Sequence, residues 1–118
     1  MSDDTIGAEG LIGGGNRVPE DLELVARFLE GDERAFESIV KKYQRMVYYL
    51  ALKIVKEHDD ADEVVQKTFV SAYRNLKNFQ GKSALKTWLY RIAVNMSKNL
   101  VRDRSRHQGE ELTEYSGR

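Results

Sequence analysis

The sequence contains no cysteine, which excludes disulfide bonds and thiolate metal sites. It has no run of eighteen apolar residues, so no segment predicts a membrane-spanning helix. Its acidic, glycine-rich start lacks the charged beginning and apolar core of a signal peptide. With 118 residues, the chain is long enough for one hydrophobic core and too short for two. These absences fit a cytoplasmic protein of one domain.

The net charge is zero, but the charges are unevenly distributed along the chain. Residues 1–66 hold eight Lys/Arg against fifteen Asp/Glu, and residues 67–106 hold ten against one. Residues 107–118 hold one against three. A chain polarised in this way can present an acidic face to one partner and a basic face to another. Two solvated faces of a stable bundle are the alternative, and composition alone does not decide between them.

The hydrophobic pattern predicts an all-α fold, a compact bundle of one short and three longer helices with flexible N- and C-terminal tails. Residues 1–18 include three consecutive glycines and show no periodicity, so we expect a disordered leader. The short helix is expected to start at Pro19 and to stop at Gly31. The ordered domain is then 19–106, and the polar residues 107–118 are expected to fray.

Local sequence signals predict where the longer helices begin. Asp32 is a good N-cap for a helix that runs to about Val55. Asp60 followed by Glu63 resembles a capping box, which places the start of the third helix at Asp60. Ser83 is expected to cap the fourth helix after a loop that bends at a glycine.

The features that could support catalysis are weak. Asp59, Asp60, Asp62 and Glu63 form a carboxylate cluster beside His58, which could suggest a metal site. Acids at the start of a helix are, however, explained by capping and by the helix dipole. The sequence contains no phosphate-binding loop, nucleophile elbow or zinc-binding pair. We therefore expect no enzymatic activity, no cofactor and no metal.

The stretch from Asn78 to Arg106 carries the strongest functional signal. Its apolar residues recur at helical spacing, and its other positions are cationic or amide-bearing, with Asp103 as the one acid. These positions are Lys82, Lys86, Arg91, Asn95, Lys98, Asn99, Arg102, Arg104 and Arg106. A helix needs only its apolar stripe to pack, so the exclusion of acid from the other faces suggests a polyanionic partner. Asparagine is a poor residue for a helix interior, and two of them one turn apart suggest the reading of base edges.

Aromatic residues lie in or beside this basic region, namely Tyr73, Phe79, Trp88 and Tyr90. Aromatics among cations suit single-stranded nucleic acid, whose bases stack on the rings while Lys and Arg follow the phosphates. Trp88 falls on the apolar stripe and is expected in the core. Phe79 lies in a polar loop, where it either contacts a base or plugs the end of the bundle.

The exposed side of the predicted third helix has two interpretations. It carries Asp62, Glu63, Gln66, Lys67, Val70 and Arg74. Spacing alone favours an ordinary polar face. Alternatively, the acids and the amide beside an exposed valine dock a partner helix, with the charges setting its register.

Three segments together resemble the first domain, region 2, of extracytoplasmic-function (ECF) sigma factors. They are GDERAFESIVKKYQRMVYYLALKIV, DADEVVQKTFVSAYRNL and FQGKSALKTWLYRIAVNMSKN. These proteins are bacterial initiation factors that give RNA polymerase its promoter specificity. The resemblance extends from Asp21 to about Arg106, and it is the combination of segments at this spacing that makes it specific.

The resemblance implies a transcription initiation factor domain that binds core RNA polymerase and recognises and melts the promoter −10 element. Residues matching those that bind the clamp helices of the largest polymerase subunit are Asp62, Glu63, Val65, Gln66 and Val70. Residues matching the DNA-binding loop and helix are Phe79, Gly81, Lys82, Ser83, Lys86, Arg91, Asn95, Lys98, Asn99 and Arg102. Phe79 and Asn95 match positions that contact a flipped non-template base, and Asn99 matches a neighbouring base-facing position. An anti-sigma factor is a further implied partner.

The sequence departs from the family pattern at two positions. Lys67 stands where the family commonly has Glu, and Leu85 stands where an aromatic residue is frequent. Residues 107–118 resemble the start of a linker, and the family's −35-reading domain is absent, which we interpret as truncation. The alternative hypotheses are a general helical module that binds single-stranded nucleic acid without polymerase contact and, with less support, a helical enzyme.

Overall fold

The computed structural model describes residues 19–116, with side chains described for 20–106. Its elements are α1 (Pro19–Leu29), α2 (Glu33–Val55), α3 (His58–Asn75), a 3-10 turn η1 (Leu76–Asn78) and α4 (Leu85–Ser116). The predicted all-α bundle of one short and three longer helices is confirmed. The predicted leader, residues 1–18, lies outside the described residues. None of the helices in the described part of the chain is long and apolar enough to cross a membrane.

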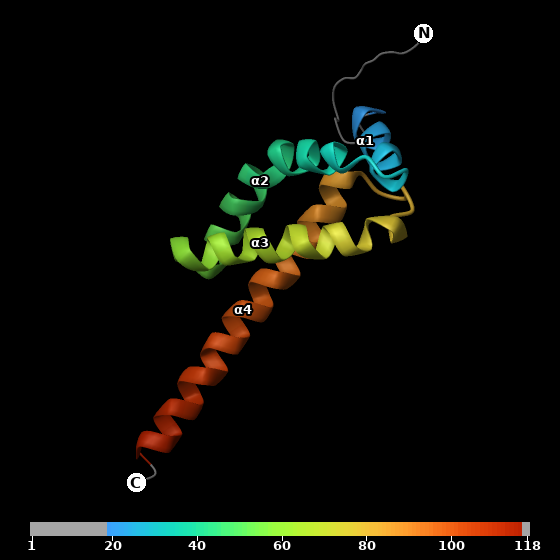
Figure 1. The fold of residues 1–118 in the computed structure, drawn as a ribbon. Helices are drawn as coiled ribbons and strands as arrows, with labels where there is room; N and C mark the ends of the chain where they lie inside the picture. Colours follow the sequence, from blue (N-terminus) through green and yellow to red (C-terminus); the bar gives the residue numbers. More distant parts are fainter. Residues whose placement is uncertain (1–18, 117–118) are drawn as a thin grey trace.

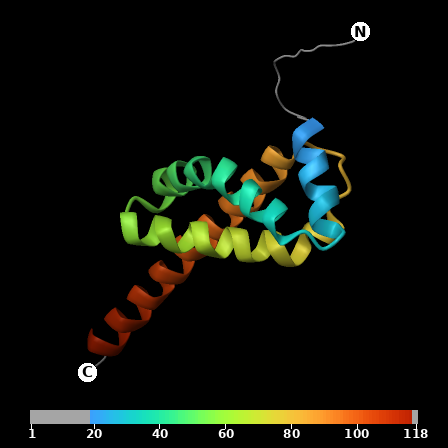
Figure 2. The same ribbon diagram turned by 45° about the horizontal axis from the view of Figure 1, so that its top comes forward.

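Helices α2, α3 and α4 pack against one another, and α1 lies against α2 (Figure 1). The second half of α4 projects beyond the other helices, as a second view also shows (Figure 2). Every element contributes to the core, which is mostly aliphatic and also includes Tyr43 and Phe69. Its fully buried members include Ile39, Val47, Leu76, Leu85 and Leu89. Fully buried alanines lie on each of the three long helices, and side chains this small let neighbouring helix axes approach closely.

A buried carboxylate ties α1 to α2. Asp21 is 1% exposed and accepts hydrogen bonds from Lys42 Nζ at 2.7 Å and from Tyr43 Oη at 2.5 Å. A buried charge is costly unless it is paired and hydrogen-bonded, and here both conditions hold. Burial, together with the hydrogen bond to Asp21, raises the pKa of Tyr43 far above its usual value, so the phenol stays protonated and continues to donate.

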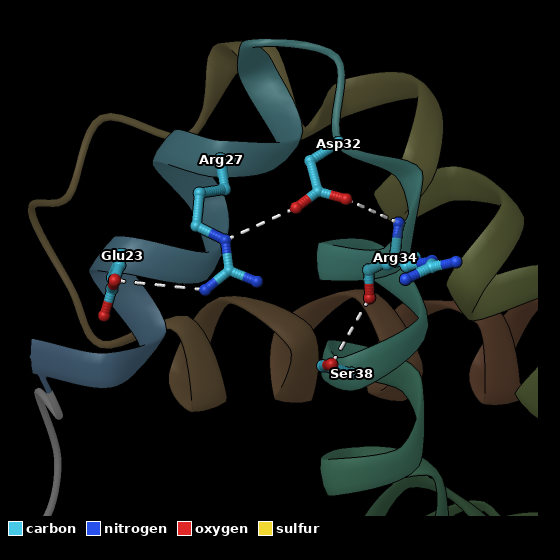
Figure 3. Close-up of polar contacts among 5 residues, drawn as sticks. All are labelled: Glu23, Arg27, Asp32, Arg34 and Ser38. Carbon is cyan, nitrogen blue, oxygen red and sulfur yellow. Dashed lines mark hydrogen bonds and ion pairs between the residues drawn. The ribbon is translucent and has the colours of Figure 1, made fainter.

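The junction between α1 and α2 follows the sequence signals (Figure 3). Gly31 has a φ of 109°, a conformation that side-chain-bearing residues rarely adopt, and it ends the turn after α1. Asp32 is the N-cap of α2, and its Oδ1 accepts a hydrogen bond from the Arg34 backbone N–H at 3.0 Å. Its other oxygen accepts from Arg27 Nε at 3.4 Å, so a single side chain caps α2 and holds the last turn of α1. Both predicted boundaries are confirmed.

The predicted start of α3 is wrong. The helix begins at His58, and Asp60 lies inside its first turn instead of capping it. The reason is Lys56, which adopts a left-handed conformation with a φ of 65° and donates its N–H to the Leu52 carbonyl. This single residue ends α2 and turns the chain early. Asp60 is then free to accept a hydrogen bond from Arg104 of α4.

The predicted limits of α4 also differ from the structure. Ser83 does not cap it, because the helix begins at Leu85 and the Ser83 hydroxyl donates to the Ala84 carbonyl at 3.4 Å. At the other end, the backbone stays helical past Arg106 as far as Ser116. Nothing in this segment forces a helix to stop, since it contains no proline and several good helix formers.

The Asp21 cluster generates a stability prediction. Tyr43→Phe removes the phenol that donates to a buried carboxylate, so we expect the free energy of unfolding to fall by about 1–3 kcal/mol. Urea unfolding followed by circular dichroism measures this change. Tyr49→Phe is the matched control, because Tyr49 is 52% exposed, and it should shift the free energy of unfolding by less than about 0.5 kcal/mol. Equal stabilities of the two variants would contradict a stabilising role for the cluster.

Candidate nucleic-acid and protein interfaces

The loop before α4 is anchored by an aromatic contact. Phe79 is half-buried against the core, and its ring lies 5.3 Å from the ring of Trp88, at a tilt of 55°. Its backbone N–H donates to the Leu76 carbonyl at 3.0 Å. Phe79 therefore plugs this end of the bundle, one of the two roles considered for it, while part of its side chain still reaches solvent.

The rest of the loop carries three of the residues predicted to bind DNA. Gly81 has a φ of 73°, which strains any side-chain-bearing residue, although a Cβ there would meet no atom within 4 Å. The constraint at Gly81 is therefore the backbone turn and not a lack of space. Beyond it, Lys82 is exposed and Ser83 is half-buried.

One exposed face of α4 carries four of the predicted DNA-binding residues, Arg91, Asn95, Lys98 and Arg102. They recur at three- and four-residue steps, so the helix brings them together on one side. Among the described residues, Asn95 and Lys98 have no side-chain hydrogen bond or ion pair within the protein. Asn99 lies beside this face, and its Oδ1 accepts a hydrogen bond from Arg102 Nη2 at 2.9 Å. We call Arg91, Asn95, Lys98 and Arg102 the α4 face.

Not every predicted DNA-binding residue joins the α4 face. Lys86 is exposed in the first turn of α4 and lies five positions before Arg91, which places it on a different side of the helix. Tyr73, which precedes the basic region in the sequence, also lies elsewhere. Its ring packs edge-on against Phe28 and Phe36, and its hydroxyl donates to Glu33, so it belongs to the surface between α2 and α3.

The end of the α4 face borders an open hollow of about 510 Å³. It is lined by Ile54, Lys98, Val101, Arg102, Ser105 and Arg106. Three cations thus surround an apolar floor to which α2 contributes Ile54 and α4 contributes Val101. Ile54 is half-buried near the end of α2, and its place in this hollow was not predicted.

The residues predicted to bind polymerase lie on the exposed side of α3. Val65, Gln66 and Val70 line one groove of about 580 Å³ between α2 and α3. Its remaining lining residues are Phe36, Val40, Phe69, Tyr73 and Arg74. Val70 is 45% exposed, so the groove offers an apolar surface to a partner. We call this feature the α2–α3 groove. Its α2 residues were missed, because helical spacing does not reveal which parts of an apolar stripe stay uncovered.

The two predicted acidic residues on α3 have different surroundings. Asp62 is exposed and has no ion pair among the described residues. Glu63 Oε2 lies 2.8 Å from Lys67 Nζ, and Glu63 Oε1 lies 3.8 Å from Arg104 Nη2. The hydrogen bond from Lys67 holds the pKa of Glu63 below its usual value, so this carboxylate is ionised and engaged within the protein.

The carboxylate cluster at the start of α3 does not assemble a metal site. His58 Nδ1 shares a hydrogen bond with the Tyr48 hydroxyl, and Asp60 pairs with Arg104. Within the range that the structure describes, no group of three or more His, Cys, Asp or Glu side chains is placed to hold a metal ion. His58 and Asp60 are instead occupied by contacts between helices.

Comparisons with known proteins point to one family. The sequence profile described as sigma-70 region 2 matches residues 39–107, which include the α4 face and the α2–α3 groove apart from Phe36. The ECF RNA polymerase sigma-E factor of Haemophilus influenzae is 44% identical over 91 residues. The match covers 77% of this chain and 48% of that relative, so the chain spans about half the relative's length.

Two solved structures share the fold. One is an NMR structure of an engineered region 2 of sigmaE in complex with GTAAAA, with a TM-score of 0.69 and 41% identity, covering 74% of this chain and 90% of that one. The other is CnrH in complex with the cytosolic domain of CnrY, with a TM-score of 0.63 and 31% identity, covering 68% and 52%. The chain therefore belongs to the sigma-70 region 2 family, and its resemblance to ECF sigma factors is confirmed.

Proposed function

We propose that this chain is a transcription initiation factor domain that recognises and melts the promoter −10 element and captures a flipped base of the non-template strand. The observation that carries the proposal is the α4 face, where Asn95 lies among three cations. Within the described residues, Asn95 has no side-chain partner and this face carries no acid. The fold neighbour in complex with GTAAAA supports a single strand as the ligand.

The residues of the α4 face have two different roles in this proposal. Arg91, Lys98 and Arg102 hold phosphates, which gives affinity without regard to sequence. Asn95 reads a base edge, because an amide offers a donor and an acceptor together and pairs well with adenine. The adenine-rich strand bound by the neighbour is compatible with this assignment.

The loop supplies the pocket for the flipped base. Phe79 presents the solvent-accessible part of its ring, and its packing on Trp88 holds that ring in place. A ring fixed in this way loses little conformational freedom when a base stacks on it. Gly81 shapes the turn, and Lys82 stands beside the pocket as a further phosphate contact.

The α2–α3 groove is the proposed docking site for core RNA polymerase. Its apolar lining fits one side of a partner helix, and Asp62 and Glu63 lie beside it to fix orientation through charge. We also infer an anti-sigma factor as a regulatory partner, which the complex of the neighbouring CnrH with the cytosolic domain of CnrY supports. The proposed role is non-catalytic and places the protein in the cytoplasm with the polymerase.

Phosphate contacts should affect every DNA sequence alike. Lys98→Ala should weaken binding to all −10-like single strands and reduce the slope of log affinity against log salt by about 0.7, the value for one phosphate of a single strand. Fluorescence anisotropy with strands varied at one base, at several salt concentrations, measures both quantities. Lys41→Ala removes another exposed lysine, this one from α2, and should change neither quantity. An unchanged salt slope in Lys98→Ala would contradict the phosphate assignment.

Loss of the base contact should depend on sequence. Asn95→Ala should cost about 1–3 kcal/mol for the strand with the preferred base and little for strands with other bases, since base-edge hydrogen bonds carry the discrimination. The same strand panel measures this difference at one salt concentration. Gln44→Ala, which removes an exposed amide from α2, is the control. An equal loss for every base would show that Asn95 has no part in reading the sequence.

The polymerase assignment predicts that the α2–α3 groove is sensitive to charge. Val70→Asp places a carboxylate in an apolar contact that excludes water, so affinity for core RNA polymerase should fall by about tenfold or more. Leu22→Asp makes the same change at a leucine of α1 that is 46% exposed, and it should leave affinity unaltered. Pulldown and biolayer interferometry with core RNA polymerase measure the binding of both variants. Wild-type affinity in a folded Val70→Asp variant would favour a nucleic-acid module without polymerase contact.

A further inference from the structure

Two cations from two different helices converge on Glu63. Lys67 reaches it from one turn further along α3, with Nζ 2.8 Å from Oε2. Arg104 approaches from α4, with Nη2 3.8 Å from the other carboxylate oxygen, while the same guanidinium bonds Asp60 at 2.5 Å. Both oxygens of Glu63 thus face positive charge supplied by the protein itself.

This arrangement changes the charge that the α3 surface presents. The sequence places two adjacent acids beside the α2–α3 groove, which suggests a strongly acidic rim. In the structure, Lys67 neutralises Glu63 and leaves Asp62 as the acid of that pair with no ion pair among the described residues. Arg74, in the last turn of α3, also lines the groove and adds another cation. The rim therefore attracts a cationic partner less than its acidic residues alone would.

The Glu63–Lys67 pair is poorly suited to a purely structural role. The two side chains are 36% and 57% exposed, and ion pairs this open contribute little to stability. The neighbouring Arg104–Asp60 contact already joins α4 to α3, and Asp60 is far less exposed than Glu63. Replacing Lys67 should therefore leave the fold intact, and we expect the substitution to change the affinity for a partner.

We propose that Lys67 is a specificity-determining residue, because it holds Glu63 in an internal pair and so weakens the attraction of the α2–α3 groove for a cationic protein partner. This inference rests on the proposed docking of polymerase at that groove. A partner that places a cation near Glu63 must displace Lys67, and a partner that places a carboxylate there meets an unneutralised ammonium once the pair opens. With Glu63 neutralised by Lys67, binding of the partner depends mainly on the apolar groove and on Asp62.

The test is a double-mutant cycle on binding to core RNA polymerase. Wild type, Lys67→Gln, Glu63→Gln and the double variant are compared at low and moderate salt. Lys67→Gln should bind about two- to fivefold more tightly at low salt, the factor that corresponds to one exposed charge pair, and the gain should shrink as salt rises. In the Glu63→Gln background, the same substitution should give a clearly smaller gain, because no carboxylate remains to be released. Lys41→Gln, on the side of α2 near α1, should give none.

The outcomes separate this inference from the function on which it rests. Unchanged or weaker binding by Lys67→Gln overturns the inference, and so does an equal gain in both backgrounds, which would mean that Lys67 acts on the partner directly. Val70→Asp is measured in the same series. If it abolishes binding while Lys67→Gln has no effect, the docking site stands and the role of Lys67 fails. If Val70→Asp has no effect either, the docking site itself is wrong.

Discussion

Burial of the apolar stripe of α4 is the constraint on which the rest of the structure depends. Leu85, Leu89 and Ala93 are at most 2% exposed, and they pack into the core that α2 and α3 form. A helix fixed by one side must present the opposite side to solvent. Asn95 and Lys98 are therefore held outward by the packing of buried residues on the opposite side of the helix. The α4 face is therefore positioned by the helix itself, and the loop contributes only at the start of α4.

Two surfaces of opposite character result from the same packing. The α4 face is cationic, and the α2–α3 groove is apolar with mixed charge at its rim. Arg104 belongs to the basic helix by sequence, but its guanidinium forms ion pairs with Asp60 and Glu63 near the start of α3. The uneven distribution of charge along the chain thus overstates the contrast between the surfaces, because some opposite charges meet where α3 and α4 pack together.

The sequence predicted features that depend on neighbouring residues better than features that depend on distant ones. Asp32 caps α2 through a hydrogen bond to a residue two positions away, and Gly31 needs only its own backbone freedom, so both were found. The start of α3 was missed because Lys56 turned the chain early, in a conformation that its side chain does not favour. The contacts of Tyr73 were not predicted, because its partners come from α1 and α2, far away in sequence.

The central claim is that one strand of DNA binds across the loop before α4 and along the α4 face. The most direct measurement is a titration of the isotope-labelled chain with the single strand GTAAAA, followed by NMR chemical shifts of the backbone amides. Our account predicts shifts concentrated from Phe79 to Ser83 and along the exposed side of α4 from Arg91 to Arg102, with α1 and the α2–α3 groove unaffected. Shifts centred on α1 or on the groove, with the α4 face unchanged, would contradict it.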